Sequence, residues 1–241
     1  MRNLARAAYI AYVYLAFALL ALAAFGAILV VPGLQRRRAI ARGAARLFLV
    51  CARMTLTVKG MERLPQGQCV IVANHASYLD GLVFTAALPP RFGFVIKREM
   101  AGVPLARTLL HRIGAEFIER FDHEKRTADT RRVLRKALSG WSLMFFPEGT
   151  FSTQPGLLKF HAGAFLIAAR AECPVVPAVV RGTRLALPPS GLLPRAAPIT
   201  VEFLPTVAAS TPQSRAAAAE LRERARSAIL LHLAEPDLEA A

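Results

Sequence analysis

The sequence predicts an α/β domain preceded by an N-terminal membrane helix or helical hairpin. Residues 7–31 form an uncharged, almost wholly apolar run, which predicts the membrane element. Beyond residue 67, short apolar runs with β-branched residues alternate with longer helical stretches, which predicts the α/β domain. The 241 residues suffice for both parts. We place the boundary after residue 58, giving an anchoring segment of residues 1–58 and a globular domain of residues 59–241.

The apolar run is long enough to cross a lipid bilayer. Its 25 residues would reach ~37 Å as a helix, whereas the hydrocarbon core is about 30 Å thick. Tyr9, Tyr12 and Tyr14 lie near one end, as in an interfacial aromatic belt. A cleaved signal peptide is disfavoured, because the run is longer than the apolar region of a normal signal peptide and no polar mature region follows it.

Arginines flank this run on both sides. The three arginines of residues 36–38 resist translocation, so this flank is predicted to stay on the cytoplasmic side. Arg2 and Arg6 make the other flank positive as well. A simple span and a monotopic hairpin, with residues 39–56 as a second, amphipathic limb, therefore both remain open.

The charge of the chain indicates a polyanionic partner. The net charge is +15 at pH 7, and 54% of the residues are hydrophobic, with a mean hydropathy of +0.38. Such a chain binds either nucleic acid or an anionic membrane surface. The long apolar run, without zinc-finger spacing or an aromatic-basic RNA motif, favours the membrane, and no nucleic acid is expected.

The three cysteines predict a reducing compartment. Cys51, Cys69 and Cys173 are scattered, odd in number and without CxxC spacing. This pattern indicates neither a disulfide framework nor a metal cluster. Each is expected to be a small buried apolar residue.

The elements of the domain follow from local pattern. Compact apolar runs predict strands at residues 69–73, 92–96, 115–118, 143–146, 175–180 and 200–203. Stretches with helix-forming composition predict helices at residues 124–138, 161–171 and 214–233.

A first polar cluster, residues 74–80, directly follows the apolar strand at 69–73. Sites of α/β folds lie at such strand ends. His75 could take a proton from a hydroxyl near neutral pH, and Asp80 could orient its ring. Five residues on a regular helix turn through about 500°, so the two side chains converge only if a turn precedes the helix. Taken alone, the spacing also fits a capping histidine and a solvated aspartate.

A second cluster, residues 145–152, ends another strand in a Pro-Glu-Gly turn. Gly149 permits a positive φ and close approach of backbone to a ligand. Glu148 and Thr150 could then bind hydroxyl groups. A plain strand-to-loop turn remains the alternative for this cluster on its own.

Together the two clusters resemble the glycerolipid acyltransferases typified by bacterial 1-acyl-sn-glycerol-3-phosphate acyltransferase. Four sequence blocks of that family occur here in order between residues 74 and 180. The first block matches Asn74, His75 and Asp80, and the third matches residues 146–150 with Ser152. The fourth, an apolar strand with a proline, matches residues 175–180. The second block matches Gly114, Phe117, Ile118 and Arg120, and two conserved lysines of the family match Lys97 and Lys159.

The resemblance implies a single acyltransferase domain with a mixed central sheet flanked by helices. It implies transfer of a fatty acyl group from acyl-CoA or acyl-ACP to the free hydroxyl of a lysolipid, by default 1-acyl-sn-glycerol-3-phosphate, in phospholipid biosynthesis. No metal or redox cofactor is implied. The implied partners are membrane lipids and the acyl carrier, and the implied location is the cytoplasmic face of a bacterial inner membrane.

The resemblance also implies roles for individual residues. His75 is the base and Asp80 orients it. Lys97 or backbone amides would stabilise the oxyanion, and Arg120 would bind the acceptor's phosphate. The residues expected to bind substrate are Asn74, Lys97, Gly114, Arg120, Glu148, Gly149, Thr150 and Lys159.

One position departs from the family pattern. The third block usually carries an arginine where this chain has Phe151, and in the family that side chain helps to hold the acceptor's phosphate. Either Arg120 suffices with another basic residue, or the acceptor head group differs, as in another lysolipid such as lyso-ornithine lipid. Phe151 could also simply pack under its loop.

Two other functions compete. A non-catalytic membrane lipid-binding protein would keep the anchor and the charge but would not need His75 and Asp80 together. A serine hydrolase is disfavoured, because no Gly-x-Ser-x-Gly motif is present.

Overall fold

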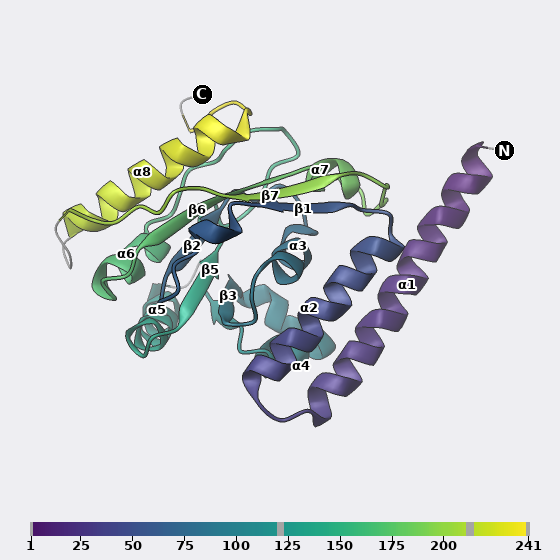
Figure 1. Cartoon of the computed structure of the whole chain (residues 1–241), viewed down its shortest axis with the longest axis horizontal. Coiled ribbons are helices and arrows are strands. Elements are labelled where there is room, and N and C mark those ends of the chain that lie inside the picture. Colours follow the sequence, from purple (N-terminus) through teal and green to yellow (C-terminus); the bar gives the residue numbers. More distant parts are fainter. Residues whose placement is uncertain (1, 120–122, 211–214, 240–241) are drawn as a thin grey trace.

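The computed structural model describes residues 2–119, 123–210 and 215–239. A seven-stranded sheet forms its centre, in the order β1-β7-β6-β2-β5-β3-β4 (Figure 1). β7 runs antiparallel to β6, and β1 pairs parallel to β7 at the edge. The other neighbouring pairs are parallel, so the sheet is mixed, as predicted. The strands are β1 (Leu56–Lys59), β2 (Val70–Ala73), β3 (Phe92–Lys97), β4 (Glu116–Ile118), β5 (Ser142–Phe145), β6 (Val175–Arg181) and β7 (Ile199–Phe203).

Helices cover both faces of this sheet. They are α1 (Arg2–Val30), α2 (Leu34–Cys51), α3 (Asp80–Ala87), α4 (Pro104–Arg112), α5 (His123–Leu138), α6 (Gly163–Arg170), α7 (Thr183–Ala186) and α8 (Arg215–Leu233), with 3₁₀ turns η1 (Met61–Arg63) and η2 (Arg98–Gly102).

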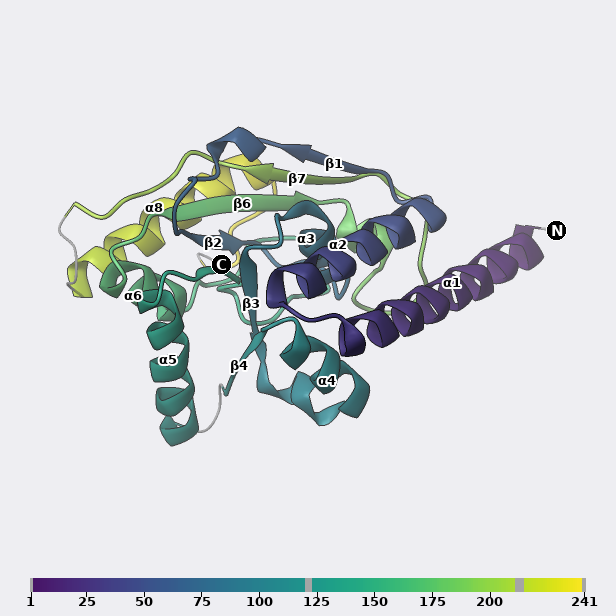
Figure 2. The same ribbon diagram turned by 60° about the horizontal axis from the view of Figure 1, so that its bottom comes forward.

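Side chains of β2 alternate between two hydrophobic cores. Ile71 and Ala73 join the core under α2 and α3, whereas Val70 and Val72 join the core under α5, α6 and α8. All four are completely buried, as expected for a central strand with helices on both faces. Figure 2 shows α5 and α4 on opposite sides of β4.

The six predicted strands are present within one or two residues, but β1 was not predicted. Leu56 and Val58 are half-buried and alternate with exposed Thr57 and Lys59, which is the period of an edge strand. Only four residues carry this pattern, and their partner β7 lies about 140 residues further along the chain. β1 crosses the boundary expected after residue 58. Cys69 and Cys173 are buried as expected, while Cys51 is only partly buried.

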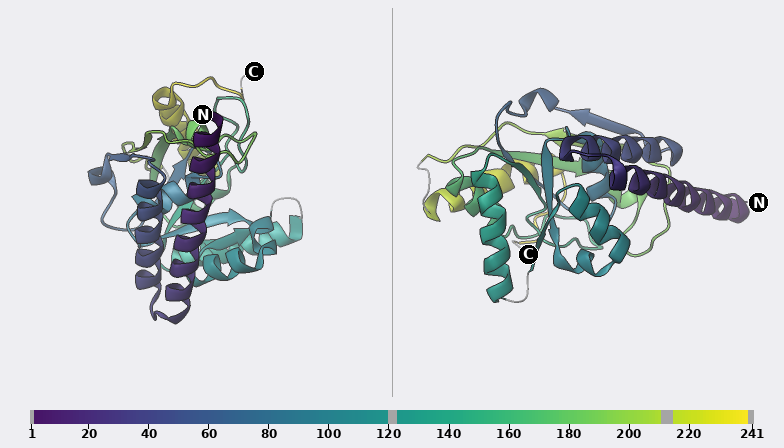
Figure 3. Two further views of the ribbon diagram at one scale, coloured as in Figure 1. Left: turned by 90° about the vertical axis from the view of Figure 1, so that its right-hand side faces the viewer. Right: turned by 90° about the horizontal axis from the view of Figure 1, so that it is seen from below.

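The N-terminal segment forms a helical hairpin. Pro32 and Gly33, the latter with φ of 86°, separate α1 from α2, which begins at Leu34 rather than in the predicted 39–56 limb. Figure 3 shows the two helices side by side and α4 on the other side of α1. The Tyr9 hydroxyl donates to the carbonyl of Ala52 at 2.7 Å. α1 is also the one described helix long and apolar enough to cross a membrane.

Arg38 joins this hairpin to the domain. Its side chain is 7% exposed, and its guanidinium donates to the carbonyls of Ile113 at 2.8 Å and Arg91 at 3.0 Å. It also lies 4.9 Å from the centre of the Trp141 ring. One arginine of the predicted cytoplasmic flank therefore makes buried contacts to the loops before β3 and β4, instead of facing a lipid surface.

We expect Arg38→Met to lower the free energy of unfolding by about 2–4 kcal/mol, because buried hydrogen bonds from a charged group are lost and their carbonyls stay unpaired. Arg36→Met is the matched control, since Arg36 is exposed on the same helix, and should change stability by about 0.5 kcal/mol at most. Denaturant unfolding of both detergent-solubilised variants measures the difference. Equal midpoints for the two would contradict the role given to Arg38.

Candidate active site

The predicted site residues gather where neighbouring parallel strands end. β2 pairs with β5 so that Val72 lies opposite Phe145, and the carboxyl ends of both strands meet at one edge. His75 follows β2 by two residues and Glu148 follows β5 by three. This edge is where open α/β sheets place their sites.

A turn brings His75 and Asp80 together, as the five-residue spacing required. Residues 74–79 lie before α3, whose first residue is Asp80. The Nδ1 atom of His75 lies 2.7 Å from Oδ2 of Asp80. The same oxygen accepts the backbone N–H groups of Ala76 at 2.6 Å and Ser77 at 2.9 Å. An oxygen that accepts these bonds favours a proton on Nδ1, which leaves Nε2 as the acceptor.

The two partners differ in access to solvent. The side chain of Asp80 is completely buried, whereas that of His75 is 19% exposed. Asp80 therefore holds the ring from beneath while the histidine can be reached by a substrate. This is the arrangement of a general base with an orienting carboxylate.

Glu148 holds His75 through its backbone. Oε1 of Glu148 accepts the N–H of His75 at 2.6 Å, and Oε2 accepts the N–H of Leu158 at 2.8 Å. The residue is 3% exposed, so it fixes two loops and does not face an open pocket. Burial raises the pKa of Glu148 to about 7, and the two backbone N–H groups and Arg184 only partly offset this.

Aromatic rings surround the imidazole. Phe146 stacks on His75 with centroids 4.4 Å apart, and Phe151 meets the same ring edge-on at 4.6 Å. Tyr78 in turn contacts Phe151 edge-on at 4.8 Å. The residue that departs from the family pattern thus packs directly against the predicted base.

Two residues expected to bind substrate make structural contacts instead: Asn74 beside His75, and Gly114 away from the site edge. The amide of buried Asn74 exchanges hydrogen bonds with the backbone of Val180, at 3.0 and 2.8 Å, and so ties the end of β2 to β6. Gly114 lies just before β4, at the opposite end of that strand from the site edge. Its φ is +71°, and an added Cβ would meet Arg38 and Leu34 at 3.1 Å. Gly114 allows the chain to turn after α4 and lets Arg38 and Leu34 pack closely against its backbone.

The other expected residues are spread around the edge. Lys97 ends β3, which is separated from β2 by β5. Gly149, with φ of 74°, and exposed Thr150 continue the turn after Glu148. Lys159 is exposed and lies 3.5 Å from Glu239. Arg120 lies outside the described residues.

An apolar groove lined by Tyr78, three residues after His75, was not predicted. It has a volume of about 260 Å³ and lies between the hairpin, α3 and the loop after α7. His75 does not line it, but Tyr78 lines it and contacts Phe151, whose ring in turn meets that of His75. Its walls come from segments far apart in the sequence, and no local pattern marks them. They are Val13, Tyr14, Phe17, Phe48, Met54, Tyr78, Leu79, Leu82, Leu187, Leu192 and Pro194.

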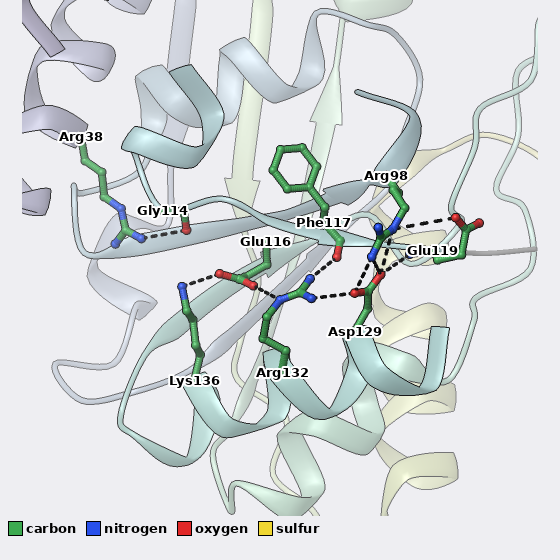
Figure 4. A network of polar contacts seen from close by, with 9 residues as sticks. All are labelled: Arg38, Arg98, Gly114, Glu116, Phe117, Glu119, Asp129, Arg132 and Lys136. Atoms are coloured by element: carbon green, nitrogen blue, oxygen red, sulfur yellow. Dashed lines mark hydrogen bonds and ion pairs between the residues drawn. The ribbon is translucent and has the colours of Figure 1, made fainter. Parts of the chain in front are cut away.

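A network of ion pairs braces the outer strands of the same sheet (Figure 4). Asp129 of α5, 1% exposed, accepts hydrogen bonds from Arg98 at 2.8 Å, Arg132 at 2.6 Å and the N–H of Glu119 at 3.0 Å. Burial alone would raise the pKa of Asp129, but these donors together hold it below its ordinary value. Arg132 also reaches Glu116 of β4 at 2.9 Å. The carboxyl ends of β3 and β4 are thereby fixed to α5.

Known proteins are similar to this chain in sequence and in fold. A family model described as acyltransferase matches residues 55–181. Over 134 residues the chain is 34% identical to a 1-acyl-sn-glycerol-3-phosphate acyltransferase, BAT2, of Brassica napus, covering 54% of this chain and 38% of that protein. Over 130 residues it is 33% identical to human lysophosphatidylcholine acyltransferase 1, covering 52% and 23%. The chain therefore matches well under half of the length of these relatives.

The fold matches that of the 1-acyl-sn-glycerophosphate (LPA) acyltransferase PlsC from Thermotoga maritima, with a TM-score of 0.80. The match covers 96% of this chain and 95% of that structure at 18% sequence identity. At this identity the likeness concerns the arrangement of the elements, including the hairpin.

The buried carboxyl of Glu148 predicts a stability that falls as pH rises. Its pKa is about 7 in the folded chain and 4.5 ordinarily, so between these values the folded state holds a proton that the unfolded state has lost. Stability is therefore greatest below about pH 4.5, falls by on the order of 3 kcal/mol up to about pH 7 and changes no further from this group. We expect Glu148→Gln to abolish this part of the pH dependence.

Denaturant unfolding between pH 4.5 and 8 tests this through the difference between wild type and Glu148→Gln, which cancels the contributions of other groups. Glu62→Gln, at an exposed glutamate, is the control and should keep the wild-type profile. Parallel profiles for wild type and Glu148→Gln would show that Glu148 ionises normally in the fold.

Proposed function

The chain belongs to the acyltransferase family, and on that premise we propose that it transfers a fatty acyl group from an acyl thioester to the free hydroxyl of a lysolipid. The observation that carries this proposal is the 2.7 Å contact between Nδ1 of His75 and the buried carboxylate of Asp80. A lipid-binding protein without catalytic activity would not need this pair. The part of the chain matched by the family model includes both residues.

The proposed chemistry uses Nε2 of His75 as a general base. It takes the proton of the acceptor hydroxyl while the hydroxyl oxygen attacks the thioester carbonyl. The tetrahedral oxyanion then collapses, the C–S bond breaks, and the proton passes to the departing thiolate. Asp80 holds the imidazole in the correct tautomer and stabilises the imidazolium. Lys97 or backbone N–H groups near the edge would stabilise the oxyanion, and the chemistry needs no metal or redox cofactor.

We propose that the apolar groove holds a fatty acyl chain. Its walls are almost wholly hydrocarbon and aromatic, and Tyr78 and Phe151 connect it to His75. An acyl chain that lies there gains the ordinary free energy of apolar burial, about 0.8 kcal/mol for each methylene. The groove is walled by α1 as well as by the domain, so the hairpin contributes to the site.

For the acceptor we propose 1-acyl-sn-glycerol-3-phosphate, with product phosphatidic acid, in phospholipid biosynthesis. The named relatives support the class of lysolipid, since they include 1-acyl-sn-glycerol-3-phosphate and lysophosphatidylcholine acyltransferases. Arg120 is the proposed phosphate ligand, because a guanidinium binds phosphate in bidentate fashion. Phe151 supplies no charge, so discrimination for the phosphate head group should be weaker than where an arginine stands at this position.

The donor is proposed to be acyl-CoA or acyl-ACP, and the location the cytoplasmic face of a bacterial inner membrane. The apolar helix α1 supports membrane attachment, and Arg36 and Arg37 on its flank favour this orientation, whereas Arg38 is buried against the domain. Activity with each purified donor in turn decides between the carriers.

We expect His75→Ala to lower kcat by at least about 10³-fold and Asp80→Asn by about 10²–10⁴-fold, because the base is removed in one variant and the wrong tautomer is favoured in the other. His232→Ala is the control, since the ring of His232 on α8 bonds to the carbonyl of Ala228 in the same helix, and this variant should keep full activity. Turnover of a lysolipid panel with both donors measures the effect. Retention of more than a few per cent of turnover by His75→Ala would reject His75 as the base.

Phe151→Arg should raise kcat/KM for the phosphate acceptor relative to lysophosphatidylcholine by about 10–100-fold, because a charge-assisted contact is worth about 1.5–3 kcal/mol. Loss of the ring against His75 should lower turnover with both acceptors, so the ratio between them is the readout. Phe151→Leu removes the ring without adding charge and should leave that ratio unchanged. The proposal that Phe151 weakens discrimination for the phosphate head group would be contradicted if wild type already strongly prefers the phosphate acceptor and Phe151→Arg leaves the ratio unchanged.

A further inference from the structure

The segment from η2 through α4 exposes apolar side chains that no local packing explains. Leu105 is 70% exposed, Val103 53% and Met100 37%. They lie within six residues, on a short helix and the turn that leads into it. Single exposed apolar residues are ordinary, but a cluster of this kind marks a surface that meets another apolar phase.

This cluster continues the apolar surface of the hairpin. Figure 3 shows α1 between α2 and α4 in both views. Arg112, at the end of α4, donates to the carbonyl of Ile28 in α1 at 3.2 Å. Leu22, Leu29 and Val30 of α1 are themselves exposed. α4 therefore packs beside α1, and both helices carry exposed apolar side chains.

The charge of this segment fits an anionic surface. From Arg98 to Arg112 the segment contains three arginines, Arg98, Arg107 and Arg112, and one acidic residue, Glu99 in η2. Arg107 is exposed on the same short helix as Leu105. Apolar side chains beside arginines, on a helix without carboxylates, are the composition of an element that lies in the interface of an anionic bilayer.

The segment is rigidly attached to the active-site edge. η2 begins at Arg98, directly after β3 ends, and Arg98 is bound to the buried carboxylate of Asp129 (Figure 4). A bilayer that holds α4 therefore also fixes the edge at which β2, β3 and β5 end. The lysolipid could then reach His75 without leaving the membrane.

We propose that η2 and α4 form a second membrane-docking element, which inserts Val103 and Leu105 into the interface of an anionic bilayer beside α1. The proposal rests on the proposed function to the extent that the substrate is a membrane lipid. It adds that the domain is held by the bilayer at two places, so that its site edge has a fixed orientation toward the lipid.

Fluorescence of a single labelled cysteine tests this on the full-length chain. Leu105→Cys is made with Cys51→Ala, since Cys69 and Cys173 are buried, and labelled with an environment-sensitive dye. The protein is reconstituted into vesicles of phosphatidylglycerol and phosphatidylcholine. Leu231→Cys is the matched control, because Leu231 is 81% exposed on α8, and Leu22→Cys on α1 is the positive control.

We expect a label at 105 to be quenched by lipid-borne nitroxide, like the label at 22, and to be at least threefold less accessible to aqueous iodide than the label at 231. Vesicles of phosphatidylcholine alone should reduce this protection. A label at 105 that behaves like the one at 231, while the label at 22 stays lipid-quenched, overturns the α4 proposal and leaves the proposed function intact. Iodide access at 22 as well would overturn membrane attachment itself.

Discussion

The arrangement depends on one histidine held from two sides by two buried carboxylates. Asp80 accepts from the ring of His75 and from the backbone N–H groups of the next two residues, Ala76 and Ser77. Glu148 accepts from the backbone N–H of His75 itself. The parallel pairing of β2 with β5 brings these carboxylates to the same edge. A buried carboxylate is costly unless it is hydrogen-bonded. Oδ2 of Asp80 and both oxygens of Glu148 accept backbone N–H groups, so the turn at residues 74–79 and the turn after β5 are held together at this edge.

The burial that positions Glu148 also raises the pKa of its carboxyl. Its two backbone donors do not fully compensate for removal from water, so the carboxyl pKa rises to about 7. Glu148 is therefore better described as a positioning residue than as a ligand for substrate. Under the proposed mechanism, a change at this residue would act through the backbone of His75 and through the loop at Leu158.

The hairpin packs against the domain and lines the groove, and it also carries the helix that is apolar enough to cross a membrane. Arg38 bonds α2 to the loops before β3 and β4, and Tyr9 bonds α1 to the end of α2. Val13 and Phe17 of α1 wall the apolar groove that leads toward His75. The same helix that is apolar enough to cross a membrane thus lines the space proposed for the acyl chain, and under the proposed function this puts the chemistry at the lipid boundary.

The sequence by itself determined the α/β class, six of the seven strands and the hairpin as one of two alternatives, and the resemblance of its ordered motifs to a family singled out the pair His75 and Asp80. These features follow from local patterns, namely the periodicity of apolar residues, the turn residues and the short motifs with fixed spacing. Tertiary structure alone decided what depends on distant contacts. It paired β1 with β7, used Asn74 to tie β2 to β6, and placed Gly114 against Arg38, away from His75. It also built the groove from segments up to about 180 residues apart, because side chains that meet only through packing share no signal along the chain.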